Sequence, residues 1–307
     1  MFGNLLDVGR IKVGHAQNDE AGTGVTVVLA ESGATAGVDV RGGAPGTRET
    51  DLLHPLNTVQ QIHAVVLSGG SAFGLAASGG VMQYLEEKGI GFETGYARVP
   101  IVAQAVLYDL NFKDARVRPD HGMGYAACLA ASGVSLPLGA VGAGCGATVG
   151  KIRGQGFISK SGIGSYSVIL NNGLVVAALV AVNALGDVVE NGQILAGALN
   201  DEGTGWLNTE NYMLQNLPDP SFGESKGQNT TIGVIATNAR LDKAQINKAA
   251  SMGHDGLARS IRPVHTSMDG DTLFALATGQ VPANPDLVGV LAARAVEQAV
   301  FSAVRSI

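Results

Sequence analysis

Short apolar runs of strand length alternate with helically spaced apolar stripes, and this pattern is the strongest constraint on the fold. Residues 25–30 (VTVVLA), 62–67 (IHAVVL) and 230–237 (TTIGVIAT) are rich in β-branched residues, which favour strands. Residues 173–187 form a longer apolar run that ends in a turn. The mixture indicates an α/β or α+β fold in which helices cover the sheets.

Helices are predicted where apolar residues recur every three or four positions, from Phe73 to Leu85 and from Val288 to Ala299. Asp242 has the residue type of an N-cap for a helix over residues 243–258, and Asn284-Pro285 marks the start of the last helix. Neither a Pro/Ser-rich linker in the first 200 residues nor an internal repeat divides the chain, which predicts one domain over residues 1–307.

The composition excludes several classes of protein. The 44 glycines among 307 residues are about twice the usual share, but they follow no Gly-X-Y period, which excludes collagen. With 46% hydrophobic and 15% charged residues, the chain can bury a core, which excludes disorder as a description of the whole. The net charge of −6 argues against a nucleic acid or an anionic membrane as partner.

Membrane, export and cysteine signals are weak. No uninterrupted apolar run has the roughly 18 residues of a membrane helix, and the first residues lack a basic start followed by an apolar stretch. We therefore expect a cytoplasmic protein with no membrane partner. Cys128 and Cys145 form no metal or disulfide pattern, and are expected to be small buried hydrophobes.

Two glycine-rich segments, residues 67–80 and 141–151, resemble anion-binding turns. A phosphate-binding P-loop requires Ser or Thr after its lysine, whereas Ile152 follows Lys151. The glycines from Gly142 to Gly146 also lack the spacing of the dinucleotide fingerprint. We therefore predict no cofactor, and expect these glycines to let backbone pack closely against backbone or substrate.

A polar stretch, residues 200–229, leads directly into the apolar strand that begins at Thr230. A threonine hydroxyl becomes a good nucleophile when the residue starts a chain, because its own α-amine then serves as base. This chemistry would require cleavage between Asn229 and Thr230. The same pattern also fits an ordinary connection from a loop to a strand.

Two carboxylates flank a glycine in the segment Asp269-Gly270-Asp271. Such a pair can face one site and hold an ammonium group, or it can belong to a simple turn. The following residues lack the oxygen ligands of a calcium-binding loop. No metal site is predicted.

Six ordered motifs begin AGTGVTVVLAESG, VVLSGGSAFGL, VGAGCGATVGK, VAVNALGD, NTTIGVIATNA and GLARSIRPVHTSMDGDT. Taken together, they resemble the aminopeptidase/D-esterase (DmpA-like) family of self-cleaving N-terminal-nucleophile hydrolases. The resemblance implies an α+β fold, a four-layer αββα sandwich, and self-cleavage into chains of residues 1–229 and 230–307. It also implies hydrolysis of a small peptide or amide substrate by a homo-oligomer, a tetramer of processed pairs.

The same resemblance assigns roles to individual residues. Thr230 becomes the nucleophile, with its α-amine as base; many relatives carry serine there, whereas the nylon-oligomer branch carries threonine after asparagine. Asn183 is the expected donor to the oxyanion, and the charge of Lys151 would keep the amine unprotonated. Asp269 and Asp271 would orient Lys151 and the amine.

The substrate pocket and its specificity are less constrained by the motifs. Tyr108 matches a tyrosine that lines the family's pocket, and Gly70 and Ser71 are expected at the pocket wall. His254 and His265 are interpreted as structural. The motifs do not fix the acid that would anchor a substrate amine, and its candidates are Glu93, Asp109 and Asp120. Gln104 is neutral, which leaves room for an amidase that needs no free amine.

Two other functions stay open from the residues. A non-catalytic protein could bind a small anion at the glycine turns between Gly142 and Gly150. An acyl transferase of the ornithine acetyltransferase type would share the nucleophile and a related fold.

Overall fold

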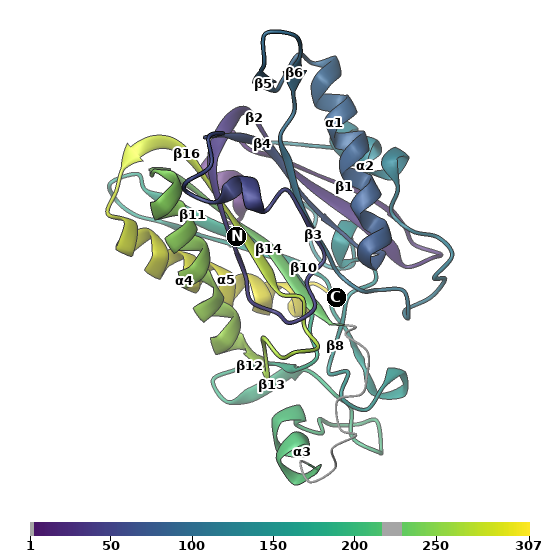
Figure 1. Cartoon of the computed structure of the whole chain (residues 1–307). Helices are drawn as coiled ribbons and strands as arrows, with labels where there is room; N and C mark the ends of the chain where they lie inside the picture. Colours follow the sequence, from purple (N-terminus) through teal and green to yellow (C-terminus); the bar gives the residue numbers. More distant parts are fainter. Residues whose placement is uncertain (1–2, 217–228) are drawn as a thin grey trace.

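The computed structural model, which describes residues 3–216 and 229–307, stacks its elements in four layers of helix, sheet, sheet and helix (Figure 1). Helices α1 and α2 cover one outer face, and helices α4 and α5 cover the other. The predicted αββα sandwich is therefore confirmed. Residues 217–228 of the polar stretch lie outside the described residues.

The first sheet has the strand order β1, β2, β4, β7, β3. Its pairs are antiparallel except for β4 and β7, which run parallel. The predicted strand at residues 62–67 is confirmed as β4. The strands span Lys12–Asn18 (β1), Thr23–Val40 (β2), Thr47–Arg48 (β3), Ile62–Ser68 (β4) and Val102–Val106 (β7).

The second sheet has the order β10, β11, β14, β16, and then the second half of β2. Strand β2 belongs to both sheets, because its first half pairs with β4 and its last residues pair with β16. The register of β2 against β4 shifts between Leu29 and Ala34. The other strands span Ile163–Ile169 (β10), Val175–Asn183 (β11), Thr230–Arg240 (β14) and Thr272–Pro282 (β16).

Three apolar cores fill the spaces between the four layers. In β11, Leu179 faces the other sheet while the adjacent Val180 faces helices α4 and α5, so every residue of this strand is buried. Burial on both faces explains why residues 173–187 read as a continuous apolar run without alternation. In β2, Val27 and Val28 divide in the same way between the helix side and the sheet side.

Two of the three predicted helices begin where the sequence predicts, and helices α2 and α3 were not predicted. Asp242 and Gln245 form a capping box at the start of α4, and Asn284 caps α5 with Pro285 in its first turn. The predicted helix from Phe73 is a 3-10 turn at first, and its α-helical part begins at Ala77. The α-helices span Ala77–Glu87 (α1), His121–Leu129 (α2), Thr209–Asn216 (α3), Lys243–Ser260 (α4) and Pro285–Arg305 (α5).

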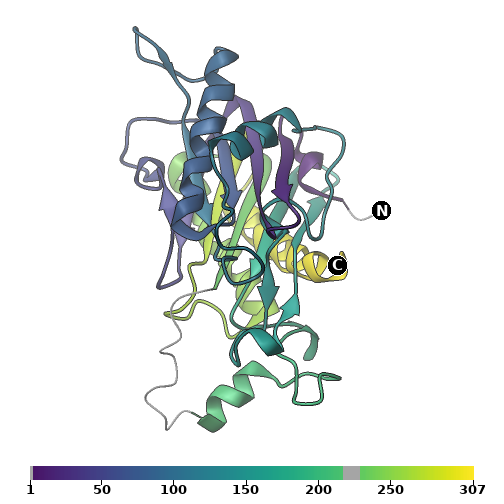
Figure 2. The same cartoon turned by 90° about the vertical axis from the view of Figure 1, so that its right-hand side faces the viewer.

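The hairpin of β5 and β6 lies at one end of the molecule, and helix α3 lies at the opposite end (Figures 1 and 2). Strands β12, β13 and β15 form a three-stranded sheet, and β8 pairs with β9. The strands span Phe92–Glu93 (β5), Arg98–Val99 (β6), Thr148–Val149 (β8), Ser159–Lys160 (β9), Asp187–Glu190 (β12), Gln193–Ala196 (β13) and Ile261–Arg262 (β15). Further 3-10 helices span Leu5–Val8, Asp51–Leu53, Gly142–Gly144 and Gln155–Phe157.

Helix α5 is the only helix in the described part of the chain that is long and apolar enough to cross a membrane. The same helix packs against the second sheet, and 61% of its most apolar 18-residue window is buried there. Arg294 and Glu297 interrupt its apolar sequence. Its composition therefore fits a core helix that fills one side of the sandwich.

Glycine lets the helices approach the sheets and each other closely. A Cβ on Gly164 of β10 would lie 2.2 Å from the Ala299 carbonyl oxygen and 2.2 Å from the Ala303 nitrogen of α5. A Cβ on Gly256 of α4 would lie 2.2 Å from the carbonyl oxygen of Ala293. In the two predicted segments, a Cβ on Gly80 would lie 1.9 Å from the His121 carbonyl oxygen and a Cβ on Gly150 1.9 Å from the Ala198 nitrogen, which confirms their predicted packing against backbone.

A single methyl group at Gly164 should therefore be destabilising. We expect Gly164→Ala to lower the free energy of unfolding by about 1–3 kcal/mol, because α5 must move away from β10. Gly156→Ala is the matched control, since no atom lies within 4 Å of a Cβ there, and it should change stability by less than about 0.5 kcal/mol. Denaturant unfolding of both variants tests this, and equal stabilities would contradict it.

Candidate active site

Thr230 is the first residue of the central strand β14, and only 5% of it is exposed. On one side, Thr230 lies opposite Asn183, the last residue of β11. On the other side, Ile232 pairs with Thr272 at the start of β16. The chain enters the sheet at this residue, so the Asn229–Thr230 bond lies at the end of a rigid element.

The carbonyl group of Asn229 is held by groups on both sides of the bond. Its oxygen accepts a hydrogen bond from the backbone N–H of Gly270 at 2.9 Å. The Thr230 hydroxyl oxygen lies 2.5 Å from the same oxygen. A donor at this oxygen polarises the carbonyl and would stabilise negative charge developing on it.

The acid pair is buried beside this bond, with Asp269 1% and Asp271 0% exposed. Asp271 accepts the backbone N–H of Thr231 at 2.6 Å, and its other oxygen is 2.8 Å from His265 Nδ1. Asp269 accepts the N–H and the hydroxyl of Thr266 at 2.8 and 2.6 Å. Burial, followed by the charge of Asp271, raises the pKa of Asp269 to about 6.

Lys151 and Asn183 form the opposite wall. The ammonium group of Lys151 donates to the backbone oxygen of Asn183 at 2.9 Å and to its side-chain oxygen at 2.6 Å. The amide nitrogen of Asn183 donates to the carbonyl oxygen of Tyr108 at 2.8 Å. Burial lowers the pKa of Lys151 to about 7, against the opposing pull of Asp269, Asp109 and Asp271.

A small pocket of about 100 Å³ opens on Thr230. Ser71 and Tyr108 line it, as predicted residues of the pocket wall. Gly70 does not line it, but its N–H donates to the buried carboxylate of Asp109 at 2.7 Å, which fixes the adjacent turn. The remaining lining residues are Ala44, Pro45, Gly46, Ala72, Val106 and Leu107.

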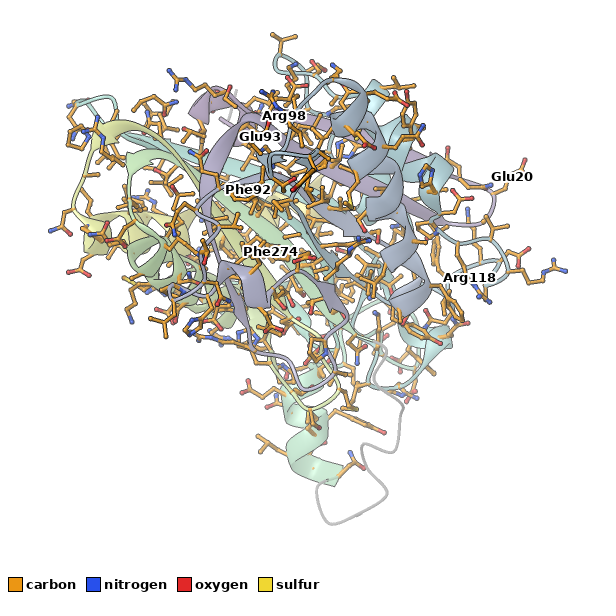
Figure 3. All side chains as sticks on the ribbon, turned by 45° about the horizontal axis from the view of Figure 1, so that its top comes forward. Glu20, Phe92, Glu93, Arg98, Arg118 and Phe274 are labelled. Carbon is orange, nitrogen blue, oxygen red and sulfur yellow. The ribbon has the colours of Figure 1, made fainter. Side chains whose placement is uncertain are left out.

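The candidate anchors for a substrate amine all lie outside this lining. Glu93 pairs with Arg98 on the β5–β6 hairpin and lines a separate cavity of about 450 Å³ (Figure 3). Asp120 caps helix α2. Asp109 is buried, where it accepts the Thr23 hydroxyl at 2.7 Å, and burial raises its pKa. Gln104 is buried too, with its amide donating to Gly74 and Ser68.

The glycine loop after residue 141 does not present its amides to a ligand. The N–H of Gly142 donates to the Gln17 side chain at 2.6 Å, and that of Gly150 donates to the Gly186 carbonyl at 3.1 Å. The ammonium group of Lys160 binds carbonyl oxygens of this loop, those of Gly144 and Ala147 among them. The loop therefore offers carbonyls to an internal cation and is unsuited to cradle an anion.

Both cysteines are buried and unpaired, as predicted, and burial raises the pKa of Cys128 to about 12 and that of Cys145 to about 11. Within residues 3–216 and 229–307, no three His, Cys, Asp or Glu side chains are grouped as metal ligands. The candidate site holds a hydroxyl, a lysine, an amide and two carboxylates.

The structure brings distant segments of the chain together at one site. Their residues are Thr230, Asn183, Lys151, Asp269 and Asp271. Their spacing in the sequence alone does not predict this proximity. Sequence reasoning missed the N–H of Gly270, because a backbone donor leaves no signal in residue type. It also missed the contact of His265 with Asp271, although the two residues lie in one motif. The oxygen of the Asn183 side chain accepts from Lys151, a contact that an oxyanion donor alone would not require.

A buried threonine at a strand start, a lysine of lowered pKa and a donor on the preceding carbonyl lie together within an αββα sandwich, and an amide-bond hydrolase could use all three. The comparisons agree with this class. The profile described as Peptidase family S58 matches residues 3–306, so the chain belongs to that family. It is a hydrolase of peptide or other amide bonds.

Curated relatives and solved structures cover nearly the whole chain. A protein of Mycobacterium bovis described as an uncharacterized aminopeptidase is 44% identical over 98% of this chain and 88% of its own length. A 6-aminohexanoate-oligomer endohydrolase of Paenarthrobacter ureafaciens is 33% identical over 90% of this chain and 75% of its own. The L-aminopeptidase D-Ala-esterase/amidase of Ochrobactrum anthropi, a variant of the Ntn hydrolase fold, has a TM-score of 0.74 at 19% identity, covering 100% of this chain and 87% of that one.

Gly270 gives a direct test of the site's geometry. A Cβ there would lie 2.9 Å from the Thr230 hydroxyl oxygen and 2.6 Å from the Ala44 carbonyl oxygen. Gly270→Ala should therefore displace the hydroxyl and reduce amide hydrolysis by about 100-fold, because small misplacements of reacting groups have that effect. Gly156→Ala is the control, and a Gly270→Ala enzyme with the rate of that control would contradict the assignment.

Proposed function

We propose that the chain cleaves itself between Asn229 and Thr230, and that Thr230 then hydrolyses small amides through an acyl-enzyme. The observation that carries this proposal is the polarised carbonyl of Asn229, which lies between the Thr230 hydroxyl and the N–H of Gly270. An ordinary connection from a loop to a strand requires neither contact.

In the first step, the hydroxyl oxygen of Thr230 attacks the carbonyl carbon of Asn229. The N–H of Gly270 stabilises the oxyanion that forms on the Asn229 oxygen. Collapse breaks the peptide C–N bond, and the nitrogen of Thr230 leaves as an amine after taking a proton. Water then hydrolyses the ester, which releases the Asn229 carboxylate and restores the hydroxyl.

Self-cleavage needs a base before any α-amine exists. Lys151 fits this task, since a pKa of about 7 leaves much of it neutral at neutral pH and it contacts Asn183, the residue opposite Thr230. Asp269, with its pKa raised to about 6, can exchange a proton in the same range. After cleavage, the α-amine of Thr230 takes over as base, and the Lys151 charge lowers the amine's proton affinity.

Hydrolysis of a substrate then repeats the same steps on an external amide. The carbonyl of the substrate occupies the position vacated by Asn229, so that the N–H of Gly270 faces its oxygen. The second amide hydrogen of Asn183 is the further donor that we assign to this oxyanion. An acyl group is transferred to Thr230, and water releases it.

The pocket favours a substrate without a charged amine at the reacting end. No carboxylate lines the pocket on Thr230 among the residues that the structure describes. The relative named 6-aminohexanoate-oligomer endohydrolase acts on amides of an aliphatic amino acid, and we propose a short aliphatic amide for this enzyme. The cytoplasmic location and the homo-oligomer stay predictions.

Substitution of Thr230 tests self-cleavage. The wild-type chain should yield a fragment of 78 residues that begins at Thr230, and Thr230→Ala should stay intact, because it lacks the attacking oxygen. Thr230→Ser keeps that oxygen and should still process. Denaturing electrophoresis with N-terminal sequencing measures this, and an intact wild-type chain after prolonged incubation would rule out self-cleavage. Amide hydrolysis retained by Thr230→Ala would exclude Thr230 as nucleophile.

Substitution of Lys151 tests its role as base. Lys151→Arg keeps the charge but cannot deprotonate, since an arginine pKa exceeds 12. The rate of self-cleavage in the wild type should rise with pH through about 7, as the lysine loses its proton. In Lys151→Arg, cleavage should be slowed by about 100-fold or more. Timed gels from pH 5 to 9 measure both, and an arginine variant that processes at the wild-type rate would refute this role.

A further inference from the structure

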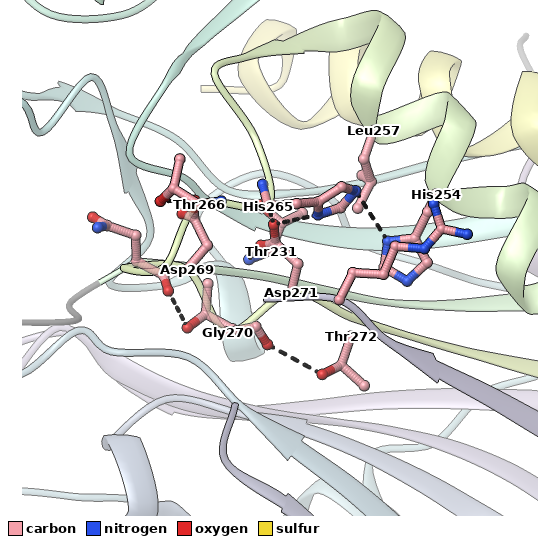
Figure 4. A network of polar contacts seen from close by, with 12 residues as sticks. Thr231, His254, Leu257, His265, Thr266, Asp269, Gly270, Asp271 and Thr272 are labelled. Atoms are coloured by element: carbon pink, nitrogen blue, oxygen red, sulfur yellow. Dashed lines mark hydrogen bonds and ion pairs between the residues drawn. The ribbon is translucent and has the colours of Figure 1, made fainter. Parts of the chain in front are cut away.

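A line of hydrogen-bonded groups runs from the start of β14 through His265 and His254 of helix α4 to Asp39 of β2, and Figure 4 shows its two histidines. The carboxylate of Asp271 is 2.8 Å from His265 Nδ1, and Nε2 of that ring is 3.3 Å from His254 Nδ1. Nε2 of His254 is 2.9 Å from the carbonyl oxygen of Asp39. His254 is fully buried, and neither histidine touches the pocket on Thr230.

The donors and acceptors along this line limit which nitrogen atoms of the two histidines carry a proton. The Asp39 carbonyl can only accept, so the proton of a neutral His254 is on Nε2 and its Nδ1 is an acceptor. Burial lowers the pKa of His254 to about 4, which keeps that ring neutral. Nε2 of His265 must then carry a proton as the donor to His254.

The contact between His265 Nδ1 and Asp271 allows two arrangements of protons. Either His265 also carries a proton on Nδ1 and faces an ionised Asp271, or Asp271 is itself protonated. Both oxygens of Asp271 already accept backbone N–H groups, from Thr231 at 2.6 Å and from His265 at 3.2 Å. Donors on both oxygens favour the ionised carboxylate.

Neighbouring charges are consistent with an imidazolium at this place. Asp39 pairs with Arg41 at 3.1 Å, so these two balance each other. Asp269 and Lys151 each interact electrostatically with Asp271 at the other end of the line. A cation on His265 balances the second carboxylate of the buried pair.

We propose that His265, held by His254, is a positioning residue that stays doubly protonated and keeps Asp271 ionised beside the nucleophile. The proposal rests on the function proposed above. Asp271 then holds the N–H of Thr231 and so fixes Thr230 at the start of β14. Because Asp271 stays ionised, Asp269 is the carboxylate of the two that takes up a proton.

The backbone of His265 adds an independent sign that its position is constrained. Its φ is +59°, in the left-handed region that non-glycine residues seldom adopt. Asparagine tolerates this conformation and can place an N–H near the position of Nδ1, but it carries no charge. His265→Asn therefore removes the cation while retaining a neutral donor to Asp271.

The first measurement reads the protonation state directly. Nitrogen NMR of a chain labelled at its six histidines, in the Thr230→Ala background, does not depend on catalysis. His265→Asn and His254→Gln assign the two signals by their disappearance. At pH 7 we expect His265 to carry protons on both nitrogens and His254 on Nε2 alone; a His265 ring with one proton overturns the proposal.

The second measurement is the pH profile of amide hydrolysis. Loss of the His265 cation raises the proton affinity of the acid pair, so the acidic limb of kcat/KM should shift upward by roughly one pH unit in His265→Asn. His254→Gln should shift it in the same direction by less, and KM should change little in either. His121→Asn, on the exposed start of α2, is the control. Superposed profiles of His265→Asn and the control overturn the proposal.

These outcomes separate the two proposals. If self-cleavage at Thr230 fails, the NMR spectrum of the unprocessed chain still reports the state of His265. If His265 is singly protonated in a chain that processes normally, only its positioning role is lost.

Discussion

The peptide bond between Asn229 and Thr230 is constrained on both sides of one strand, and the site depends on this constraint. Asn183 of β11 lies opposite Thr230, and the N–H of Gly270, two residues before β16, binds the Asn229 oxygen. Pairing on both edges fixes the hydroxyl relative to the carbonyl that it would attack. Because the bond lies at the end of the strand, the chain before it can depart without breaking the sheet.

The four layers create the electrostatics that this chemistry needs. Burial between sheets and helices lowers the pKa of Lys151 to about 7 and raises that of Asp269 to about 6, so two groups of opposite type exchange protons near neutrality. The network of Asp271, His265 and His254 reaches the same site from α4. Close glycine packing, as at Gly164, lets a sheet and a helix approach each other closely.

Much of this arrangement could be predicted from the sequence, and the limits have physical causes. Strand-length apolar runs and the caps at Asp242 and Asn284 are local signals, and they placed the elements correctly. The helix at Phe73 begins later than predicted because Ser71 adopts a left-handed conformation, with its N–H bound to the Leu107 carbonyl. Side chains such as Lys151 and Asn183 meet only through long-range pairing, and a backbone donor such as Gly270 has no residue signature.

The central claim is that Thr230, as the first residue of its chain, carries the acyl group during hydrolysis. Mass spectrometry of enzyme quenched during turnover of a slow ester or amide tests it most directly. We predict an acyl adduct confined to the peptide that begins at Thr230, within a fragment of 78 residues. An adduct on another residue such as Ser71, or turnover by a chain that is still intact across Asn229–Thr230, would contradict the account.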